Sequence, residues 1–213
     1  LRYYEKRGIP AMACDCKTGA GTGAFLPLVK KTLAELLAKR EAKGMKGRMT
    51  RIMVVGVPNV GKSSFINRMA GTKRAKAEDR PCVTRGKQWV SLDKDVELLD
   101  MPGVLWPKFE DPLVGEKLAF TGAVKDGVVD IELLAMRLLS YLAANYPERL
   151  AERFKMTDLA GLSGWELLEL AGRKRGMLVS GGEVNTERAA ITVMDEYRGG
   201  KLGRLTFEAP PEE

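Results

Sequence analysis

The eight residues from Gly56 to Ser63, Gly-Val-Pro-Asn-Val-Gly-Lys-Ser, have the types and spacing to bind phosphate. They follow the apolar run 52–55 and precede a helix-like segment, 64–69. Glycines let the backbone curl so that several N–H groups converge, and the following helix adds its positive end. In this P-loop pattern Lys62 reaches the β- and γ-phosphates, and the Ser63 hydroxyl binds Mg²⁺. A glycine-rich turn with an incidental lysine is the alternative, but the flanking strand and helix favour nucleotide binding.

A second phosphate-binding pattern follows downstream, where Asp100-Met-Pro-Gly103 ends an apolar segment. Behind a P-loop, this Asp-x-x-Gly is typical of the γ-phosphate sensor of GTPases, in which Asp100 holds Mg²⁺ through water and the Gly103 N–H meets the γ-phosphate. Thr84, in the irregular segment 71–86, is a candidate switch threonine that closes on Mg²⁺ and the γ-phosphate. An ordinary loop threonine is the alternative for Thr84.

Recognition of guanine in GTPases also needs Asn-Lys-x-Asp, and this tetrapeptide is absent from the chain. A segment similar to the base-binding loop, Asp15-Cys-Lys-Thr-Gly19, lies upstream of the P-loop rather than downstream of Asp100. The sequence after Gly103 becomes helical instead. The order of the nucleotide-binding elements is therefore permuted.

These residues need a sheet and helices to position them. We predict a short strand at 9–14, a helix whose apolar residues recur at helical spacing from Phe25 to Leu37, and a flexible basic linker at 39–51. The P-loop strand is followed by a β-hairpin with strands at 89–92 and 96–99. The fold class is thus α/β, a P-loop GTPase domain.

The C-terminal part is predicted to be all helical. Helices are expected after the N-cap Asp130, at Pro147, after a capping box at Ser163, and from Thr186 to the pair Gly199-Gly200. We place the domain boundary where the α/β alternation stops, which gives a G domain over 1–127 and a helical domain over 128–213.

Composition narrows the classes of function. The chain has 213 residues, a formal charge of +7 and no histidine, so His-based catalysis is excluded and a polyanionic partner such as RNA is favoured over a merely well-solvated surface. The three cysteines form no zinc spacing and indicate a reducing cytoplasm. No run is long enough for a membrane span. The start, Leu1 to Arg7, is neither an initiator methionine nor a signal peptide, and we interpret it as the end of a helix that begins upstream.

Six segments together resemble the circularly permuted ribosome-assembly GTPases of the YlqF/RbgA type. They are Gly56–Ser63, Arg80-Pro-Cys-Val-Thr84, Leu98–Asp111, Thr121–Asp126, Tyr146-Pro-Glu-Arg-Leu150 and Lys174–Gly182. The resemblance covers almost the whole chain. It implies that Asn-Lys-x-Asp lies upstream of Leu1, so that this chain is an N-terminal truncation with an incomplete G domain.

The family resemblance also implies a function. It indicates a GTP hydrolase that acts as a switch in late assembly of the large (50S) ribosomal subunit, with a helical RNA-binding domain that docks on the subunit precursor and its rRNA. A monomer in the bacterial cytoplasm is expected, and an organelle is less favoured. Val104 follows Gly103 where many GTPases have a water-orienting Gln, so turnover should be slow without the ribosomal particle. Asn59 is implied to help hold K⁺, although loop capping is its alternative role.

The residues expected to bind nucleotide are Asn59, Val60, Gly61, Lys62, Ser63, Ser64, Lys17, Thr84 and Gly103. Ser63, Thr84 and Asp100 are the expected Mg²⁺ ligands, and Lys62, Thr84 and Gly103 the expected catalytic residues. Two other readings remain: an RNA-binding module with a vestigial nucleotide site, and a small-molecule P-loop kinase, which the sequence disfavours because an arginine-rich lid is missing.

Overall fold

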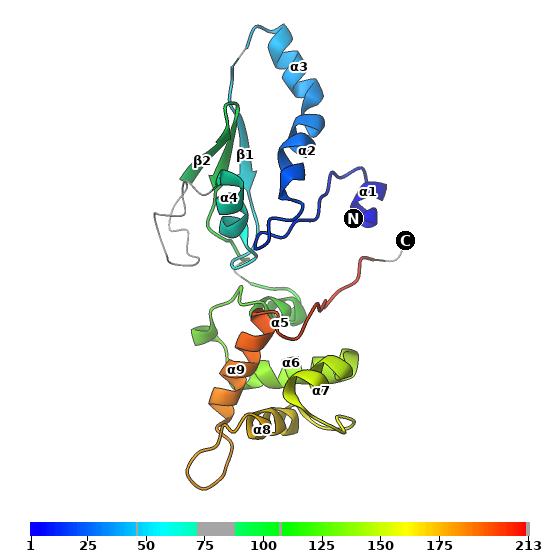
Figure 1. Ribbon diagram of the computed structural model, residues 1–213, viewed down its shortest axis with the longest axis vertical. Coiled ribbons are helices and arrows are strands. Elements are labelled where there is room, and N and C mark those ends of the chain that lie inside the picture. Colours follow the sequence, from blue (N-terminus) through cyan, green and yellow to red (C-terminus); the bar gives the residue numbers. More distant parts are fainter. Residues whose placement is uncertain (46, 72–87, 107, 212–213) are drawn as a thin grey trace. The chain divides into compact units, whose positions relative to one another are not determined.

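The computed structural model describes residues 1–45, 47–71, 88–106 and 108–211 (Figure 1). The chain forms two compact units, Leu1–Leu105 and Trp106–Glu213. The first contains a small sheet with its helices, and the second is helical. Thr84 lies outside the described residues, as do Arg80 and Cys82.

A three-stranded mixed sheet organises the first unit. Its strands are β1 (Thr50–Val54), β2 (Gln88–Asp93) and β3 (Val96–Asp100), in the order β1-β3-β2. Strand β3 is parallel to β1 and antiparallel to β2, with an irregularity between Ser91 and Asp93. The predicted hairpin is therefore confirmed.

Helix α4 (Lys62–Ala70) follows the P-loop and packs on the sheet (Figure 1). Its Ile66 is buried with Val90 and Leu98, and the ring of Phe65 meets that of Phe25 edge to face at 5.0 Å. Upstream in the chain lie α1 (Arg2–Lys6), a 3-10 helix (Thr22–Ala24), α2 (Phe25–Thr32) and α3 (Ala34–Ala42).

Three predictions for this unit need correction. Residues 9–14 do not form a strand. The predicted helix from Phe25 onward is broken at Leu33, whose φ of −99° and ψ of 8° leave the helical region. Just before it, the Thr32 hydroxyl donates to the Leu28 carbonyl at 2.8 Å, a side-chain bond that often bends helices. The basic segment 39–51 lies partly in α3 and partly in β1, so that only 43–49 connects them.

The second unit consists of five α-helices and a short 3-10 helix in the part of the chain that the structure describes. These are α5 (Pro112–Phe120), the 3-10 helix (Asp126–Val128), α6 (Ile131–Asn145), α7 (Pro147–Phe154), α8 (Gly164–Lys174) and α9 (Thr186–Arg198). The predicted starts are confirmed. Asp130 Oδ1 accepts from the Leu133 N–H at 2.9 Å, and Ser163 and Glu166 form the reciprocal capping box.

Helix α6 is central to this unit and contacts α5, α7, α8 and α9 (Figure 1). Its apolar residues Leu134, Ala135, Leu138 and Leu142 are buried, and Ile131 is partly buried against the same core. Within the described residues no helix combines the length and the apolar character needed to cross a bilayer.

The contacts divide the chain at Leu105/Trp106, earlier than the boundary between residues 127 and 128 that we predicted. The reason is α5, whose Ala119 and Phe120 are buried in the helical core. Arg198 of α9 donates to the carbonyls of both residues, at 2.9 and 3.1 Å. Because α5 also exposes Leu113, its sequence does not have a simple apolar stripe.

Candidate nucleotide-binding site

The two phosphate-binding motifs leave the sheet at the same edge. In the parallel pair of β1 and β3, Val54 is in register with Asp100, and these are the last residues of their strands. The P-loop follows β1, and the Asp100-x-x-Gly103 turn follows β3. Ligands of open α/β sheets bind outside the carboxyl ends of the strands, which is where these turns lie.

The P-loop between β1 and α4 contains two residues with positive φ. Asn59 and Gly61 have positive φ values of 60° and 95°. Gly61 is the N-cap of α4, and the first turn of that helix contains no acidic residue. The helix therefore presents backbone N–H groups and a positive dipole end to the loop. Of the other expected contacts, Val60 and Ser64 are exposed at the loop and in the first turn.

Lys62 lies across its own loop. Its Nζ donates to the carbonyl oxygens of Gly56 at 3.0 Å and Val57 at 2.8 Å. An ammonium group has three donors, so two such bonds leave capacity for a phosphate oxygen. The lysine charge is therefore held at the mouth of the loop.

Ser63 and Asp100 form the oxygen-rich part of the site. Ser63 Oγ lies 3.4 Å from Asp100 Oδ2, and Asp100 is only 7% exposed at the end of β3. A hydroxyl and a carboxylate are the hard oxygen donors that Mg²⁺ prefers. These residues therefore fit the expected metal, whereas Thr84, the third expected ligand, lies outside the described residues.

Gly103 is packed directly against the P-loop. A Cβ built on Gly103 would lie 2.5 Å from Pro58 Cα, 2.6 Å from Pro58 N and 3.0 Å from Lys62 Nζ. Only glycine allows the two turns to approach this closely. The Asp100-x-x-Gly103 turn and the P-loop are thus in contact, while the next residue, Val104, is 70% exposed.

The upstream loop of Asp15 to Ala20 is a closed turn beside α4. Asp15 Oδ1 accepts from the backbone N–H groups of Lys17 at 2.8 Å and Thr18 at 3.3 Å. These hydrogen bonds, that of Lys17 first, hold the pKa of Asp15 below its ordinary value. Burial raises the pKa of the Cys16 thiol, and Cys14 adds to this effect, so Cys16 stays a neutral thiol at neutral pH.

Sequence reasoning missed the residue that joins this loop to the P-loop helix. Arg68, in the last turn of α4, donates from Nε to the Cys16 carbonyl at 2.9 Å and from Nη2 to the Lys17 carbonyl. The expected base contact Lys17 is exposed in the loop. A segment that precedes the P-loop in sequence thereby lies beside the helix that follows it.

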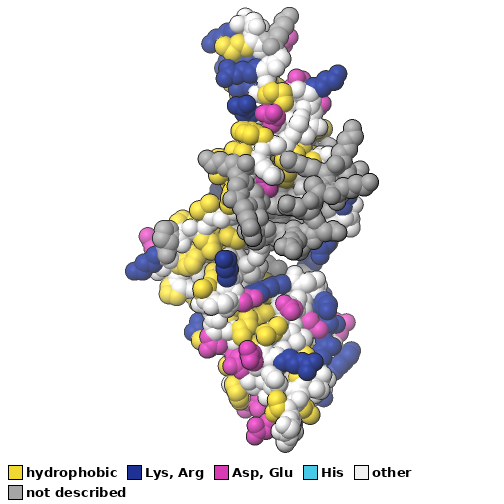
Figure 2. Space-filling model, turned by 90° about the vertical axis from the view of Figure 1, so that its left-hand side faces the viewer, with side chains coloured by type: hydrophobic (Ala, Val, Ile, Leu, Met, Phe, Trp, Pro, Cys, Tyr) yellow, Lys and Arg dark blue, Asp and Glu magenta, His cyan; other side chains and the backbone are white. Residues whose placement is uncertain are grey.

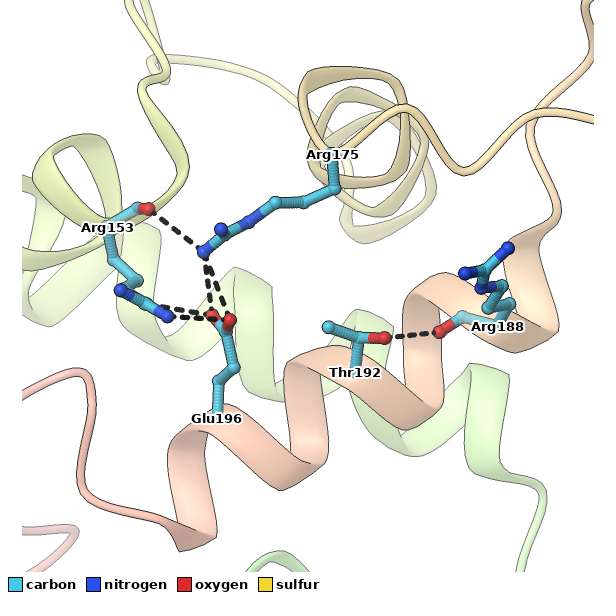
Figure 3. Close-up of polar contacts among 5 residues, drawn as sticks. All are labelled: Arg153, Arg175, Arg188, Thr192 and Glu196. Carbon is cyan, nitrogen blue, oxygen red and sulfur yellow. Dashed lines mark hydrogen bonds and ion pairs between the residues drawn. The ribbon is translucent and has the colours of Figure 1, made fainter.

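The helical unit contains a buried carboxylate that the sequence did not reveal (Figure 3). Glu196 of α9 is 7% exposed and accepts from Arg153 at 2.7 and 2.8 Å and from Arg175 at 3.0 and 3.1 Å. Burial acts to raise its pKa, but the hydrogen bonds of Arg153 and the charges of both arginines lower it on balance. The signal that the sequence offered for this buried carboxylate was an acidic residue close to the apolar residues Val193 and Met194.

Next to this carboxylate lies a basic hollow of about 500 Å³. Its charged lining contains one acid, Glu152, and six basic side chains. The basic side chains are Arg149, Arg153, Lys155, Lys174, Arg175 and Lys201. Glu196 holds two of the arginines, and the remaining four cations are exposed.

In the first unit, Lys and Arg side chains gather at the end where α3 lies (Figure 2). Lys39, Lys43 and Arg48 are exposed there.

Comparisons with known proteins identify the family of the chain. Residues 51–137 match the family described as "50S ribosome-binding GTPase". The ribosome biogenesis GTPase A of Bacillus licheniformis is 44% identical over 211 residues, which cover 99% of this chain and 74% of that protein. The protein of the same name from Priestia megaterium is 43% identical over 213 residues, or 100% and 74% of the two chains.

Solved structures lead to the same group. The crystal structure of GNP-bound YlqF from T. maritima matches with a TM-score of 0.59 and 26% identity, over 97% of this chain and 72% of that one. The predicted P-loop GTPase fold and the family resemblance are thus confirmed. This chain belongs to the ribosome biogenesis GTPase A family.

Proposed function

We propose that this protein binds and hydrolyses GTP as a switch in late assembly of the large ribosomal subunit. The observation that carries the proposal is the convergence of Lys62, Ser63, Asp100 and Gly103 at one sheet edge. The names of the relatives, ribosome biogenesis GTPase A, support the biological context.

Phosphoryl transfer needs positioning and charge neutralisation more than a covalent partner. The P-loop N–H groups and Lys62 bind the phosphates, and the Gly103 N–H orients the γ-phosphate. Ser63 and Asp100 would hold Mg²⁺, together with the expected ligand Thr84. When bound, Mg²⁺ neutralises charge on the phosphate oxygens.

The residue that follows Gly103 does not supply a group that could activate the attacking water. Val104 is apolar and exposed, so it cannot orient water by hydrogen bonding. We therefore expect slow turnover in isolation and faster turnover on the ribosomal particle. Asn59, which has a positive φ of 60° in the loop, is proposed to help hold K⁺.

The partner is proposed to be the large-subunit precursor, contacted through rRNA. The basic hollow of the helical unit offers four exposed cations, and α3 with its connection to β1 offers others. Such clusters bind phosphate backbones with salt-dependent, largely sequence-neutral affinity. We place the protein in the bacterial cytoplasm as a monomer.

An RNA-binding module with a vestigial nucleotide site is the competing function. Decay of the site would remove the constraint on Gly103 and Asp100, yet both keep their places against the P-loop. The intact arrangement therefore favours the enzyme.

The test is GTP hydrolysis by the full-length protein with and without large-subunit particles. Lys62→Ala and Ser63→Ala should each abolish stimulated hydrolysis and nucleotide-dependent particle binding. Lys31→Ala, which removes an exposed cation from α2, is the control and should change neither. Particle binding that ignores the nucleotide in the unaltered protein would instead support the vestigial-site alternative.

A further inference from the structure

Arg68 makes a two-pronged contact between segments far apart in the sequence. Its Nε donates to the Cys16 carbonyl at 2.9 Å and its Nη2 to the next carbonyl, that of Lys17. A Cβ built on Gly19 would lie 3.5 Å from Arg68 Nη1, so the guanidinium also faces the far side of the loop. The planar group thus spans the loop from Cys16 to Gly19.

The loop's own bonds fix its shape but not its place. Asp15 closes it through its side chain to Lys17 and Thr18, and through its backbone to Gly19 at 2.7 Å and Ala20 at 2.9 Å. At its end, Gly21 has a φ of 76°, and a Cβ there would lie 2.3 Å from the Ala13 carbonyl oxygen. A preformed turn of this kind can be moved as a unit, so the contact that locates it matters.

The loop and the helix that follows it both contact α4. The ring pair of Phe25 and Phe65 anchors the start of α2, and Arg68 binds the loop itself. Arg68 is exposed, so its hydrogen bonds to the two carbonyls remove little polar surface from water. Charge-assisted bonds from a rigid fork chiefly fix geometry.

The position along α4 gives this contact its meaning. Arg68 lies six residues after Lys62, which is about 9 Å along a helix axis. Helix α4 therefore connects the loop expected to contact the phosphates, through Lys62, with the loop expected to contact the base, through Arg68. We propose that Arg68 is a positioning residue, which sets the base-binding loop of residues 15–20 at the right place relative to the P-loop. This inference rests on the proposed binding of GTP.

The proposal predicts different effects of Arg68 on binding of the base and on binding of the phosphates. Without Arg68, the P-loop keeps Lys62 and its N–H groups, so phosphate binding should persist. The base loop becomes free to shift, so affinity that depends on the base should fall. A residue that only stabilises the fold would weaken both kinds of binding together.

The test uses Arg68→Gln in the full-length protein, with displacement of a fluorescent GDP by GDP and by inorganic triphosphate. We expect GDP affinity to fall about tenfold, since bonds to a charged group are lost. The inhibition constant of triphosphate should stay within about twofold of the unaltered protein. In steady-state hydrolysis, KM for GTP should rise while kcat changes little.

Three comparisons make the result interpretable. Arg68→Lys keeps the charge but not the fork, and should give an intermediate GDP affinity. Lys31→Gln removes one exposed cation from α2 of the same unit, and should change nothing. Lys62→Ala should lose both ligands. A parallel loss of GDP and triphosphate in Arg68→Gln, or unchanged GDP affinity, overturns the positioning role. Failure of the unaltered protein to bind GDP would overturn the proposed function instead.

Discussion

Gly103 and Pro58 lie so close together that a single added carbon would not fit between them. The Cβ of any other residue at position 103 would come within 2.5 Å of Pro58 Cα. This contact joins the turn after β3 to the P-loop after β1. The proposed γ-phosphate sensor and the proposed phosphate-binding loop are therefore in direct contact.

Gly103→Ala should therefore damage the site by forcing the two turns apart. We expect a loss of about 1–3 kcal/mol in stability, as for overpacked cores, and a larger loss of affinity for a GTP analogue than for GDP. Calorimetric titration with both nucleotides measures the difference. Gly23→Ala is the control, because a Cβ at Gly23 meets nothing within 4 Å. Equal behaviour of the two variants would show that the contact has no role.

Glu196→Gln should destabilise the helical unit. The change removes charge-assisted hydrogen bonds from Arg153 and Arg175, whose side chains are 30% and 32% exposed, so we expect a cost of about 2 kcal/mol at neutral pH. Thermal unfolding of Glu196→Gln measures the change. Glu183→Gln, an exposed carboxylate of the same unit, should leave Tm unchanged.

The same carboxylate predicts a pH dependence. The folded pKa of Glu196 lies below its ordinary value of 4.5. Its contribution to stability is thus present above the unfolded pKa and is lost as the pH falls through the folded pKa. Tm should decline from about pH 5 downward, and less steeply in Glu196→Gln than in the unaltered protein. An identical decline in both would contradict the assignment.

Arg198→Lys should loosen α5 from the helical core. Arg198 donates to the carbonyls of Ala119 and Phe120. It also donates to both carboxylate oxygens of Asp126, each at 2.7 Å, and these two bonds keep the pKa of Asp126 below its ordinary value. Lysine cannot reproduce this fork, so we expect a loss of about 2 kcal/mol. Arg188→Lys, at an exposed site on the same helix, is the matched control for thermal unfolding. Equal Tm values for the two variants would contradict this role.

The basic hollow should determine how RNA binding responds to salt. The triple change of Lys155, Lys174 and Lys201 to Gln should make RNA binding less dependent on salt. The negative slope of log binding constant against log salt concentration should become shallower by about two to three, since each lost phosphate contact removes nearly one unit. Titration of an rRNA fragment at several salt concentrations gives the slope. The same charge removed at Lys125, Arg188 and Arg204, which are exposed on this unit, should leave the slope nearly unchanged.

Local chemistry explains what could be predicted from sequence. Asp130, Ser163 and the P-loop glycines act within a few residues of themselves, so their patterns indicated helix starts and the loop correctly. The break at Leu33 was missed because apolar spacing continues across it, while the bond from Thr32 to Leu28 alters the backbone.

Long-range contacts explain what could not be predicted. Arg68 is an ordinary basic residue at the end of a helix until the loop at Cys16 is placed beside it. Glu196 likewise depends on Arg153 of α7 and on Arg175, which directly follows α8. No local pattern encodes such pairings, because the partners are separated by more than 20 residues of chain.

The most direct test of the central claim, that Ser63 and Asp100 form a Mg²⁺-dependent GTP site, is the affinity of a non-hydrolysable GTP analogue with and without Mg²⁺. In the full-length protein, removing Mg²⁺ should weaken binding at least about tenfold, or 1.4 kcal/mol. Ser63→Ala should bind weakly and no longer respond to Mg²⁺. An unaltered protein that is indifferent to Mg²⁺, or a Ser63→Ala variant that keeps the full response, would contradict the account.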